Sequence, residues 1–207
     1  MVKQINQGHA AILVGTQMLA KGHDFHDVTL VGVVDADLAL FSADFRATES
    51  LAQLITQVTG RAGRGKKAGE VLIQSEQPEH PFWQNLLQHG YESVADNLLS
   101  ERIQMELPPH GFWAVWRAEA KEKDLAIELL QQVAGLLQQS NSSVLILGPV
   151  PALMEKRAGR YRAQLLMRSA DRGALHQLID QHIHSVTKLK LARKARWSID
   201  IDPTELI

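Results

Sequence analysis

Short apolar runs recur along the first half of the chain. Residues 11–14 and 28–34 are almost wholly apolar and rich in β-branched side chains, and residues 69–75 show a similar pattern. Runs of this kind are typical of parallel strands that are covered on both faces of a sheet. The pattern therefore predicts strands over these three segments.

Helical periodicity separates the second run from the third. Apolar residues recur there at positions i, i+3, i+4 and i+7, namely Leu51, Leu54, Ile55 and Val58. This spacing places them on one face of a helix, with Thr48 as its expected N-cap. A further helix is expected over residues 81–105, opened by Pro81. Strands that alternate with helices predict a parallel α/β layer.

A proline pair divides the chain. Pro108-Pro109, followed by Gly111, stops the preceding helix and forces an extended turn. The predicted domains are therefore residues 1–108 and 109–207. The elements expected in the second domain are a strand at 112–119, a helix at 122–139, strands at 144–148 and 160–168, a helix at 171–185 and a strand at 193–201. This βαββαβ order predicts a small ferredoxin-like α+β domain.

The composition is that of a globular protein. Of 207 residues, 45% are hydrophobic and 22% are charged. No apolar run approaches the roughly 20 residues that span a bilayer, and the N-terminus lacks the apolar core of a signal peptide, which predicts a cytoplasmic protein with no membrane partner. The lack of cysteine excludes disulfides and thiolate metal sites. The closest histidine pair, His182 and His184, is interpreted as solvated helix surface, so no metal site is predicted.

Charge is distributed unevenly, although the net charge is only −1. Residues 152–197 contain 11 Lys and Arg against three Asp and Glu, a local balance of +8 that leaves −9 for the rest of the chain. Attraction to phosphate depends on local rather than total charge. This asymmetry is expected of a face that binds nucleic acid or an acidic peptide tail, although a solvated basic surface gives the same count.

Two segments of the first domain carry residues suited to phosphate chemistry. The first, residues 15–25 (GTQMLAKGHDF), directly follows an expected strand. Ligands of open α/β sheets bind at the carboxyl ends of strands, where the Thr16 hydroxyl is placed to hold a backbone phosphate. Lys21 adds a cation, Gly22 a close backbone approach, and Asp24 a carboxylate that can accept from a ribose hydroxyl.

The second segment, residues 57–65 (QVTGRAGRG), ends the helix that precedes the third run. On an α-helix Gln57, Arg61 and Arg64 fall within a sector of roughly 60°, so they can point at one target. Glycines such as Gly60 leave room for a bulky anion, and planar guanidiniums match phosphate oxygens with paired donors. In phosphoryl transfer such arginines stabilise charge on the γ-phosphoryl group. Taken alone, the segment also fits a helix C-cap with solvated charges.

Together and in this order, the two segments resemble motifs V and VI of superfamily 2 helicases. The strings GTQMLAKGHDF, LVGVVDAD, ADFRATE and QVTGRAGRG resemble the PriA family of bacterial replication-restart DNA helicases specifically. The likeness continues in the second domain through LPPHGFWAVWRAEA, LGPVPAL, GRYRAQLLMR and WSIDIDP, so it covers nearly the whole chain.

The resemblance implies an ATP-dependent 3′-to-5′ DNA helicase that recognises abandoned replication forks and reloads the replicative helicase. The chain would supply part of a RecA-like, parallel-sheet motor lobe and the family's C-terminal domain. Thr16 is implied to contact the tracking DNA strand, with Lys21 expected beside it, and Arg61 and Arg64 are implied to reach the γ-phosphate of Mg2+-bound ATP. The other residues expected at the ATP site are Gly22, Asp24, Gln57 and Gly60.

Several parts of that family are not found in this sequence. It has no Gly-rich Walker A loop and no DEAH-type box, so the chain alone is expected to be inactive as an ATPase. The apolar run that ends in Asp35 and Asp37 imitates a magnesium-binding strand, but we interpret both acids as strand-end loop residues. The family's cysteine-rich zinc region is implied upstream. The sequence is thus expected to begin inside the motor lobe, as an excised piece or as the product of a shortened gene.

Basic residues of the second domain are expected to bind DNA. The candidates fall on or beside expected strands and are Arg160, Arg162, Lys190, Arg193, Lys194 and Arg196. Tyr161 and Trp197 are interleaved with them, a mixture suited to backbone neutralisation and base stacking, although both also fit a hydrophobic core and Trp197 fits it better. The resemblance implies branched and single-stranded DNA, single-stranded DNA-binding protein and other primosome proteins as partners at the nucleoid. Arg172 is a candidate for holding the acidic tail of single-stranded DNA-binding protein.

Two alternatives stay open. The chain is a non-catalytic nucleic-acid-binding and docking module, which predicts DNA affinity with a steep salt dependence and no ATP turnover, or it is the tail of a different superfamily 2 translocase. The likeness of the second domain to the same family disfavours the last alternative.

Overall fold

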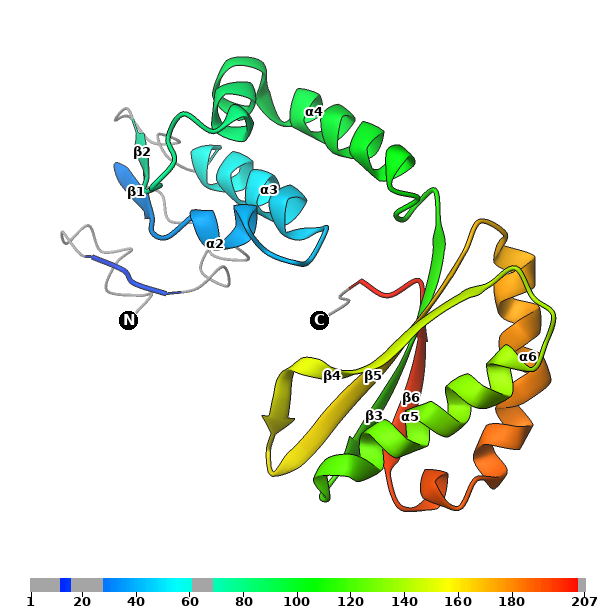
Figure 1. Ribbon diagram of the computed structural model, residues 1–207. Helices are drawn as coiled ribbons and strands as arrows, with labels where there is room; N and C mark the ends of the chain where they lie inside the picture. The colour runs from blue at the N-terminus through cyan, green and yellow to red at the C-terminus, as the bar shows by residue number, and fades with distance from the viewer. Residues whose placement is uncertain (1–11, 16–27, 61–68, 205–207) are drawn as a thin grey trace. The chain divides into compact units, whose positions relative to one another are not determined.

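The computed structural model describes residues 12–15, 28–60 and 69–204. The chain separates into two compact units, Met1–Leu99 and Ser100–Ile207 (Figure 1). The division falls within helix α4 (Pro81–Gln104), ahead of the Pro108-Pro109 pair. Among the described residues, no helix is both long enough and apolar enough to cross a membrane.

Two parallel strands form the sheet of the first unit. β1 (Leu30–Val33) pairs with β2 (Glu70–Ile73), and Leu30 lies opposite Glu70 at the start of the register. Both strands lie inside segments expected to be strands. Parallel pairing over two separate runs confirms the expected parallel α/β layer for this unit.

The expected strand at 11–14 is wrong for its described part. Residues 12–14 have no strand structure, and the Ile12 and Val14 side chains are 93% and 88% exposed. An apolar run becomes a strand only where neighbouring backbone completes its hydrogen bonds. The pattern of apolar residues does not report whether such a neighbour is there.

Helix α3 (Ala47–Thr59) carries the apolar stripe expected from the sequence, because Leu51, Ile55 and Val58 are buried. The helix begins earlier than expected, and Arg46, not Thr48, occupies the N-cap position. The cause is Asp44, whose carboxylate accepts from Arg46 N at 2.9 Å and whose carbonyl accepts from Ala47 N at 3.0 Å. A short helix that the sequence did not indicate, α2 (Asp37–Leu40), precedes it.

Helix α4 starts at the expected Pro81 but is not continuous. Gly90 has φ 80° and ψ −173°, a conformation that glycine adopts without the steric cost of a Cβ. The single helix expected over 81–105 is therefore two helical segments joined at Gly90. The second segment is tied to α3 through Gln53, whose Nε2 donates to Tyr91 Oη at 3.0 Å.

The second unit shows the βαββαβ order expected from the sequence. Its elements are β3 (Phe112–Ala120), α5 (Lys123–Gln138), β4 (Leu145–Arg157), β5 (Arg160–Ser169), α6 (Arg172–Lys188), the 3-10 helix η2 (Leu191–Arg193) and β6 (Arg196–Ile201). The strands form one sheet in the order β4-β5-β3-β6, and every neighbouring pair is antiparallel. Helices α5 and α6 pack on one face of this sheet (Figure 1).

Alternation along the strands decides which side chains of the second unit enter its core. On β3, Trp116 and Ala118 are buried in the core cluster formed with the helices, whereas Arg117 and Glu119 lie on the opposite, open face. Trp197 of β6 stacks on Trp116 with ring centroids 5.8 Å apart, as the core interpretation of this tryptophan predicted.

Two strands of the second unit differ in length from those expected. β4 continues past residue 148 to Arg157 and forms a hairpin with β5, in which both turn residues, Ala158 and Gly159, have positive φ. Such a turn matches the twist of the paired strands. The last strand begins at Arg196 and not at residue 193, because residues 191–193 form η2.

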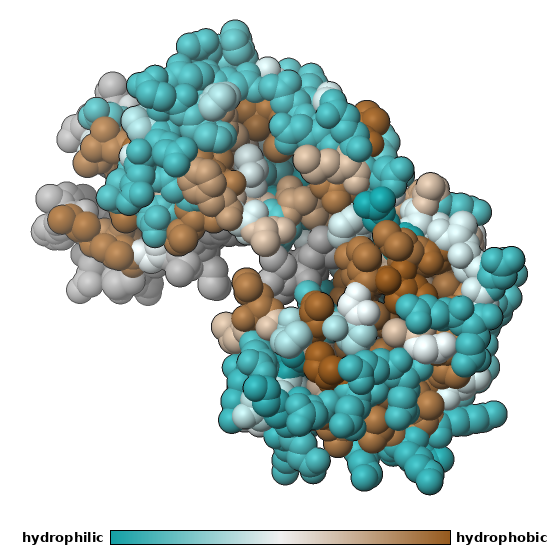
Figure 2. Space-filling view, in the orientation of Figure 1, coloured by the Kyte–Doolittle hydropathy of each residue, from teal (hydrophilic) through white to brown (hydrophobic). Residues whose placement is uncertain are grey.

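Hydrophobic side chains also reach the surface of both units (Figure 2). In the first unit, Leu30 of β1 and Leu72 of β2 are 55% and 53% exposed. The described residues thus cover only one face of the β1-β2 sheet.

Candidate nucleic-acid interface

The predicted motor residues are described only in part. Gln57 is exposed on the last turn of α3, and Gly60 is the exposed C-cap residue of that helix. The other predicted motor residues lie outside the described residues, namely Thr16, Lys21, Gly22, Asp24, Arg61 and Arg64. The expectation that Gln57 points with the two arginines at a triphosphate stays a prediction.

Asp37 is held by the loop that follows β2. Its two carboxylate oxygens accept from Ser75 Oγ at 2.7 Å and from the backbone N–H of Glu76 at 2.6 Å. Trp83 Nε1 donates to the same Ser75 hydroxyl at 3.2 Å. Because both oxygens of Asp37 already bind protein donors, its environment fits a structural link between the start of α2 and the loop after β2, and not a magnesium ligand. The interpretation as a strand-end loop residue holds for Asp35 but is wrong for Asp37, which begins α2. Among the described residues no group of three potential metal ligands gathers.

The antiparallel register gathers basic residues at one end of the four-stranded sheet. β3 and β4 end there, and β5 and β6 begin there, so Glu119 lies opposite both Arg162 and Arg196, and Arg157 lies opposite Arg160. These residues come from separate parts of the sequence. We call this region the basic end and define it by Lys156, Arg157, Arg160, Arg162, Lys188, Lys190, Arg193, Lys194 and Arg196.

The hairpin tip at the basic end places two arginines side by side. Arg157 and Arg160 are directly opposite across the β4-β5 pair, where like charges repel each other. Neither forms an ion pair with a residue that the structure describes. Lys156 packs on the neighbouring Tyr161, with its Nζ 4.6 Å from the ring centroid and 3.3 Å from the hydroxyl. Repulsion of this kind favours an anion at the tip.

A second group of cations lies between the end of α6 and the start of β6. Its members are Lys188, Lys190, Arg193, Lys194 and Arg196, all of them exposed. Within the described part of the chain, none of the five has an ion-pair partner. The sequence pattern predicted a strand from residue 193, but Arg193 lies in η2 and Lys194 directly follows it. The turn still leaves them adjacent to the strand that follows.

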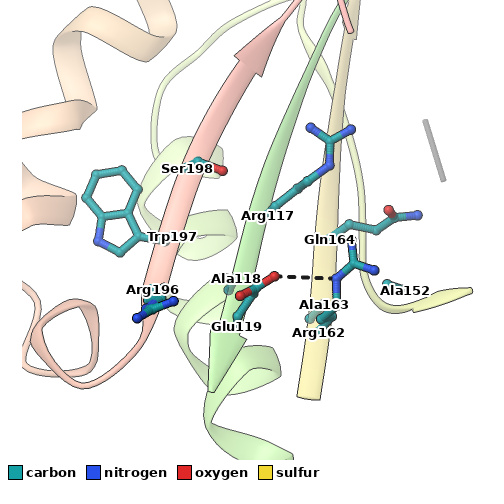
Figure 3. Close-up of a pocket in the computed structure, with 10 residues that line it drawn as sticks. All are labelled: Arg117, Ala118, Glu119, Ala152, Arg162, Ala163, Gln164, Arg196, Trp197 and Ser198. Carbon is teal, nitrogen blue, oxygen red and sulfur yellow. Dashed lines mark ion pairs between the residues drawn. The ribbon is translucent and has the colours of Figure 1, made fainter. Parts of the chain in front are cut away.

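A hollow of about 290 Å³ opens near the basic end on the open face of the sheet. Its polar lining comes from three adjacent strands and consists of Arg117, Glu119, Arg162, Gln164, Arg196 and Ser198 (Figure 3). The register sorts these side chains into two rows, one centred on Glu119 and one centred on Arg117. Arg117 is ion-paired with Asp200, so the guanidiniums of Arg162 and Arg196 beside one carboxylate give the hollow a net positive charge.

The other end of the sheet carries arginines that are already paired. Arg168 Nη2 lies 2.7 Å from Glu106 Oε2. Arg172 forms an ion pair with Asp202, and its guanidinium lies 5.3 Å from the ring centroid of Phe112. The predicted partner-binding residue Arg172 is therefore 58% exposed but not without a counter-charge. The two ends of one sheet thus differ in how much positive charge they leave uncompensated.

Sequence reasoning missed Arg117, Glu119, Gln164 and Ser198. The signal was available, because polar residues alternate with buried ones along β3, β5 and β6. Alternation identifies the side chains that share a face of one strand, but it does not say which strands are neighbours.

Two protein-family models match the chain. The helicase conserved C-terminal domain matches residues 1–66, and the Primosomal protein N C-terminal domain matches residues 103–204. The replication restart protein PriA of Haemophilus influenzae is 45% identical over 206 residues, which are 99% of this chain and 28% of the relative. The PriA proteins of Synechocystis sp. and Bacillus subtilis are 41% and 34% identical over 169 and 204 residues, or 81% and 98% of this chain and 20% and 25% of the relatives.

The chain therefore spans about a quarter of the length of these curated relatives. The similarity runs through both units, from the segment matched by the helicase domain to the one matched by the primosomal domain. The chain belongs to the PriA family of replication restart proteins and corresponds to their C-terminal part.

Proposed function

We propose that the intact protein is an ATP-dependent 3′-to-5′ DNA helicase that recognises stalled replication forks and restarts replication by primosome assembly. The observation that carries this proposal is the similarity along nearly the whole chain to proteins named for replication restart. A helicase C-terminal domain over residues 1–66 supports the motor activity. The nucleoid would then be its place of action in the cytoplasm.

In this proposal the first unit completes an ATP site whose other half lies on another part of the intact protein. Arg61 and Arg64 stabilise charge on the γ-phosphate, and Gln57 assists from the last turn of α3. The remaining ATP contacts are Gly22, Asp24 and Gly60. When bound, Mg2+ and ATP supply the phosphoryl group and its counter-charge. The chain alone does not hydrolyse ATP, because its sequence has no Walker A lysine or DEAH-type carboxylates.

The second unit binds branched or single-stranded DNA through its basic end. Thr16 and Lys21 contribute a DNA contact in the first unit. We assign a ferredoxin-like arrangement to the second unit, supported by its βαββαβ order and by the antiparallel strand order β4-β5-β3-β6. Since most cations of the basic end have no ion-pair partner among the described residues, this end neutralises phosphates better than the opposite end, where Arg168 and Arg172 are paired.

A partner contact is proposed at the opposite end of the sheet. Arg172 is exposed enough to accept a second carboxylate beside Asp202, which supports a role in holding the acidic tail of single-stranded DNA-binding protein. Other primosome proteins are the further partners that we propose. A zinc site, if the intact protein has one, lies in a cysteine-containing segment other than these 207 residues, which contain no cysteine.

A second candidate function is a non-catalytic module that binds nucleic acid. The completeness of the basic end within residues 100–207 favours it, because DNA binding there needs no ATP site. The two functions are compatible if the module describes this chain and the helicase describes the intact protein.

The experiment compares the intact protein with its Arg61→Ala and Arg64→Ala variants in a DNA-stimulated ATPase assay. We expect each variant to lose about a thousandfold in kcat, because such arginines contribute roughly 10³ to 10⁵ in phosphoryl transfer. DNA affinity, measured on the same samples, should stay within about twofold and serves as the control for folding. An ATPase rate within about twofold of wild type would show that the two arginines do not serve this site.

A further inference from the structure

Arg162 is a partly buried arginine whose donors are not used by the protein. Its side chain is 22% exposed, and its ion pair joins Nε to Glu119 Oε1 at 3.6 Å. That distance exceeds the length of a hydrogen bond. A guanidinium carries five N–H donors, and none of those of Arg162 is hydrogen-bonded to a residue that the structure describes. The donors therefore reach the hollow without a protein acceptor.

Glu119 faces a second guanidinium on its other side. Arg196 of β6 lies opposite Glu119 in the register, as Arg162 of β5 does (Figure 3). The carboxylate thus lies between two arginines, with a long ion pair to Arg162 and no ion pair to Arg196 among the described residues. The neighbouring Arg117 differs, because its Nη1 donates to Asp200 Oδ2 at 2.7 Å and its charge is fully matched. The surplus positive charge of the hollow belongs to Arg162 and Arg196.

We propose that the hollow binds a phosphodiester group of a single DNA strand through Arg162 and Arg196, and that Glu119 is the protein's own competitor for these arginines. The inference rests on the DNA-binding role proposed for the second unit and names the residues that set its strength. Adjacent strands lie about 4.8 Å apart, so Arg162 and Arg196 each lie one strand away from Glu119, and their backbones are about twice that spacing from each other. Both long side chains can converge on one anion above it, each with paired donors.

Glu119 makes the hollow selective for a polyanion over a small anion. An isolated phosphate must overcome repulsion from Glu119 with only the two arginines of the hollow to offset it. A DNA strand brings further phosphates to neighbouring cations such as Arg160 and Lys194, and its total attraction offsets that repulsion. Glu119 therefore lowers the affinity for every anion and excludes small ones, while it keeps Arg162 extended across the open face of the sheet.

The test uses the 207-residue chain and a fluorescein-labelled oligothymidylate, with the dissociation constant measured by fluorescence anisotropy at moderate salt. Glu119→Gln should bind about three- to tenfold more tightly, because one negative charge is removed a few ångströms from the phosphate. Arg162→Gln should bind more weakly. In the double variant the gain from Glu119→Gln should become smaller, since part of the effect of the carboxylate acts through Arg162.

Glu128→Gln is the matched control. Glu128 is exposed on α5, which covers the opposite face of the sheet, and it loses the same charge. Its affinity should stay within about 1.5-fold of wild type. Inorganic phosphate should compete with the oligothymidylate more effectively in Glu119→Gln than in wild type.

The inference is overturned if Glu119→Gln binds no more tightly than wild type, or if Glu128→Gln gains as much. In either case the proposed DNA-binding role survives, provided that substitutions at the basic end weaken binding. If wild type does not bind the oligothymidylate, or if neither Arg162→Gln nor changes at Arg193 and Lys194 weaken binding, the proposed role itself is wrong.

Discussion

The two units of the chain differ in how much of their structure and chemistry the described residues complete. In the second unit, one core cluster of 18 buried residues lies between a four-stranded sheet and two helices. In the first unit the described cluster has eight buried residues, and large apolar side chains of both strands are half exposed.

This difference in packing is matched by a difference in chemistry. The second unit assembles its candidate surface from its own strands, whereas the residues assigned to the motor in the first unit lie mostly outside the described part of the chain. The second unit therefore holds its candidate residues in defined contacts. The role of the first unit follows from its sequence and its family.

The largest expected effect tests the difference in packing. Leu129 of α5 is 0% exposed, and Leu129→Ala should lower the free energy of unfolding of the second unit by about 3 kcal/mol, since a buried leucine loses both its burial and its packing. Leu72→Ala on β2 should cost less than about 1 kcal/mol, because Leu72 is 53% exposed. Urea denaturation, with hydrogen exchange to assign each transition to its unit, measures both. Equal costs would mean that the exposed face of the β1-β2 sheet is buried in the folded chain.

A smaller effect tests whether the two ends of the four-stranded sheet differ as their ion pairs suggest. The double variant Arg193→Gln, Lys194→Gln should weaken single-stranded DNA binding about tenfold and reduce the slope of log affinity against log salt by about one to two. The matched double variant Arg168→Gln, Arg172→Gln removes the same charge where Glu106 and Asp202 already compensate it. Its affinity should change less than about twofold. Equal losses from the two variants would show that net charge alone governs binding.

The smallest expected effect concerns the acids at the end of β1. Asp37→Asn should cost about 1 kcal/mol of stability, because its carboxylate accepts from Ser75 Oγ and from the Glu76 amide. Asp35→Asn should change stability by less than about 0.5 kcal/mol, since Asp35 is exposed and has positive φ, a conformation that asparagine tolerates. Thermal unfolding measures both. A calorimetric magnesium signal that Asp37→Asn abolishes would contradict the structural role.

Most secondary structure could be predicted because it depends on local periodicity. The apolar stripe of α3 and the six major elements of the second unit follow from spacing that each segment carries in itself. The errors have local causes of a different kind. Asp44 moved the start of α3, Gly90 interrupted α4, and the η2 turn delayed β6. Each of these three deviations depends on the backbone conformation or hydrogen bond of one residue. The spacing of apolar residues carries no information about either.

For the candidate surface, the sequence predicted the basic composition but not the arrangement of the residues. The excess of Lys and Arg in residues 152–197 identified the basic character, and Arg160, Arg162 and Arg196 were among its named candidates. Glu119 and Arg117 were not, because they precede that segment in the chain. They join the surface through the pairing of β3 with β5 on one side and with β6 on the other.

The sequence by itself determined the family, the order of elements, and which side chains of each strand share a face, since all three are written in residue types and their spacing. Only the tertiary structure decided that β3 lies between β5 and β6, and hence that one glutamate faces two arginines from distant parts of the chain. The physical reason is that strand neighbours are chosen by the burial of whole faces against α5 and α6, a collective free energy that no single segment contains.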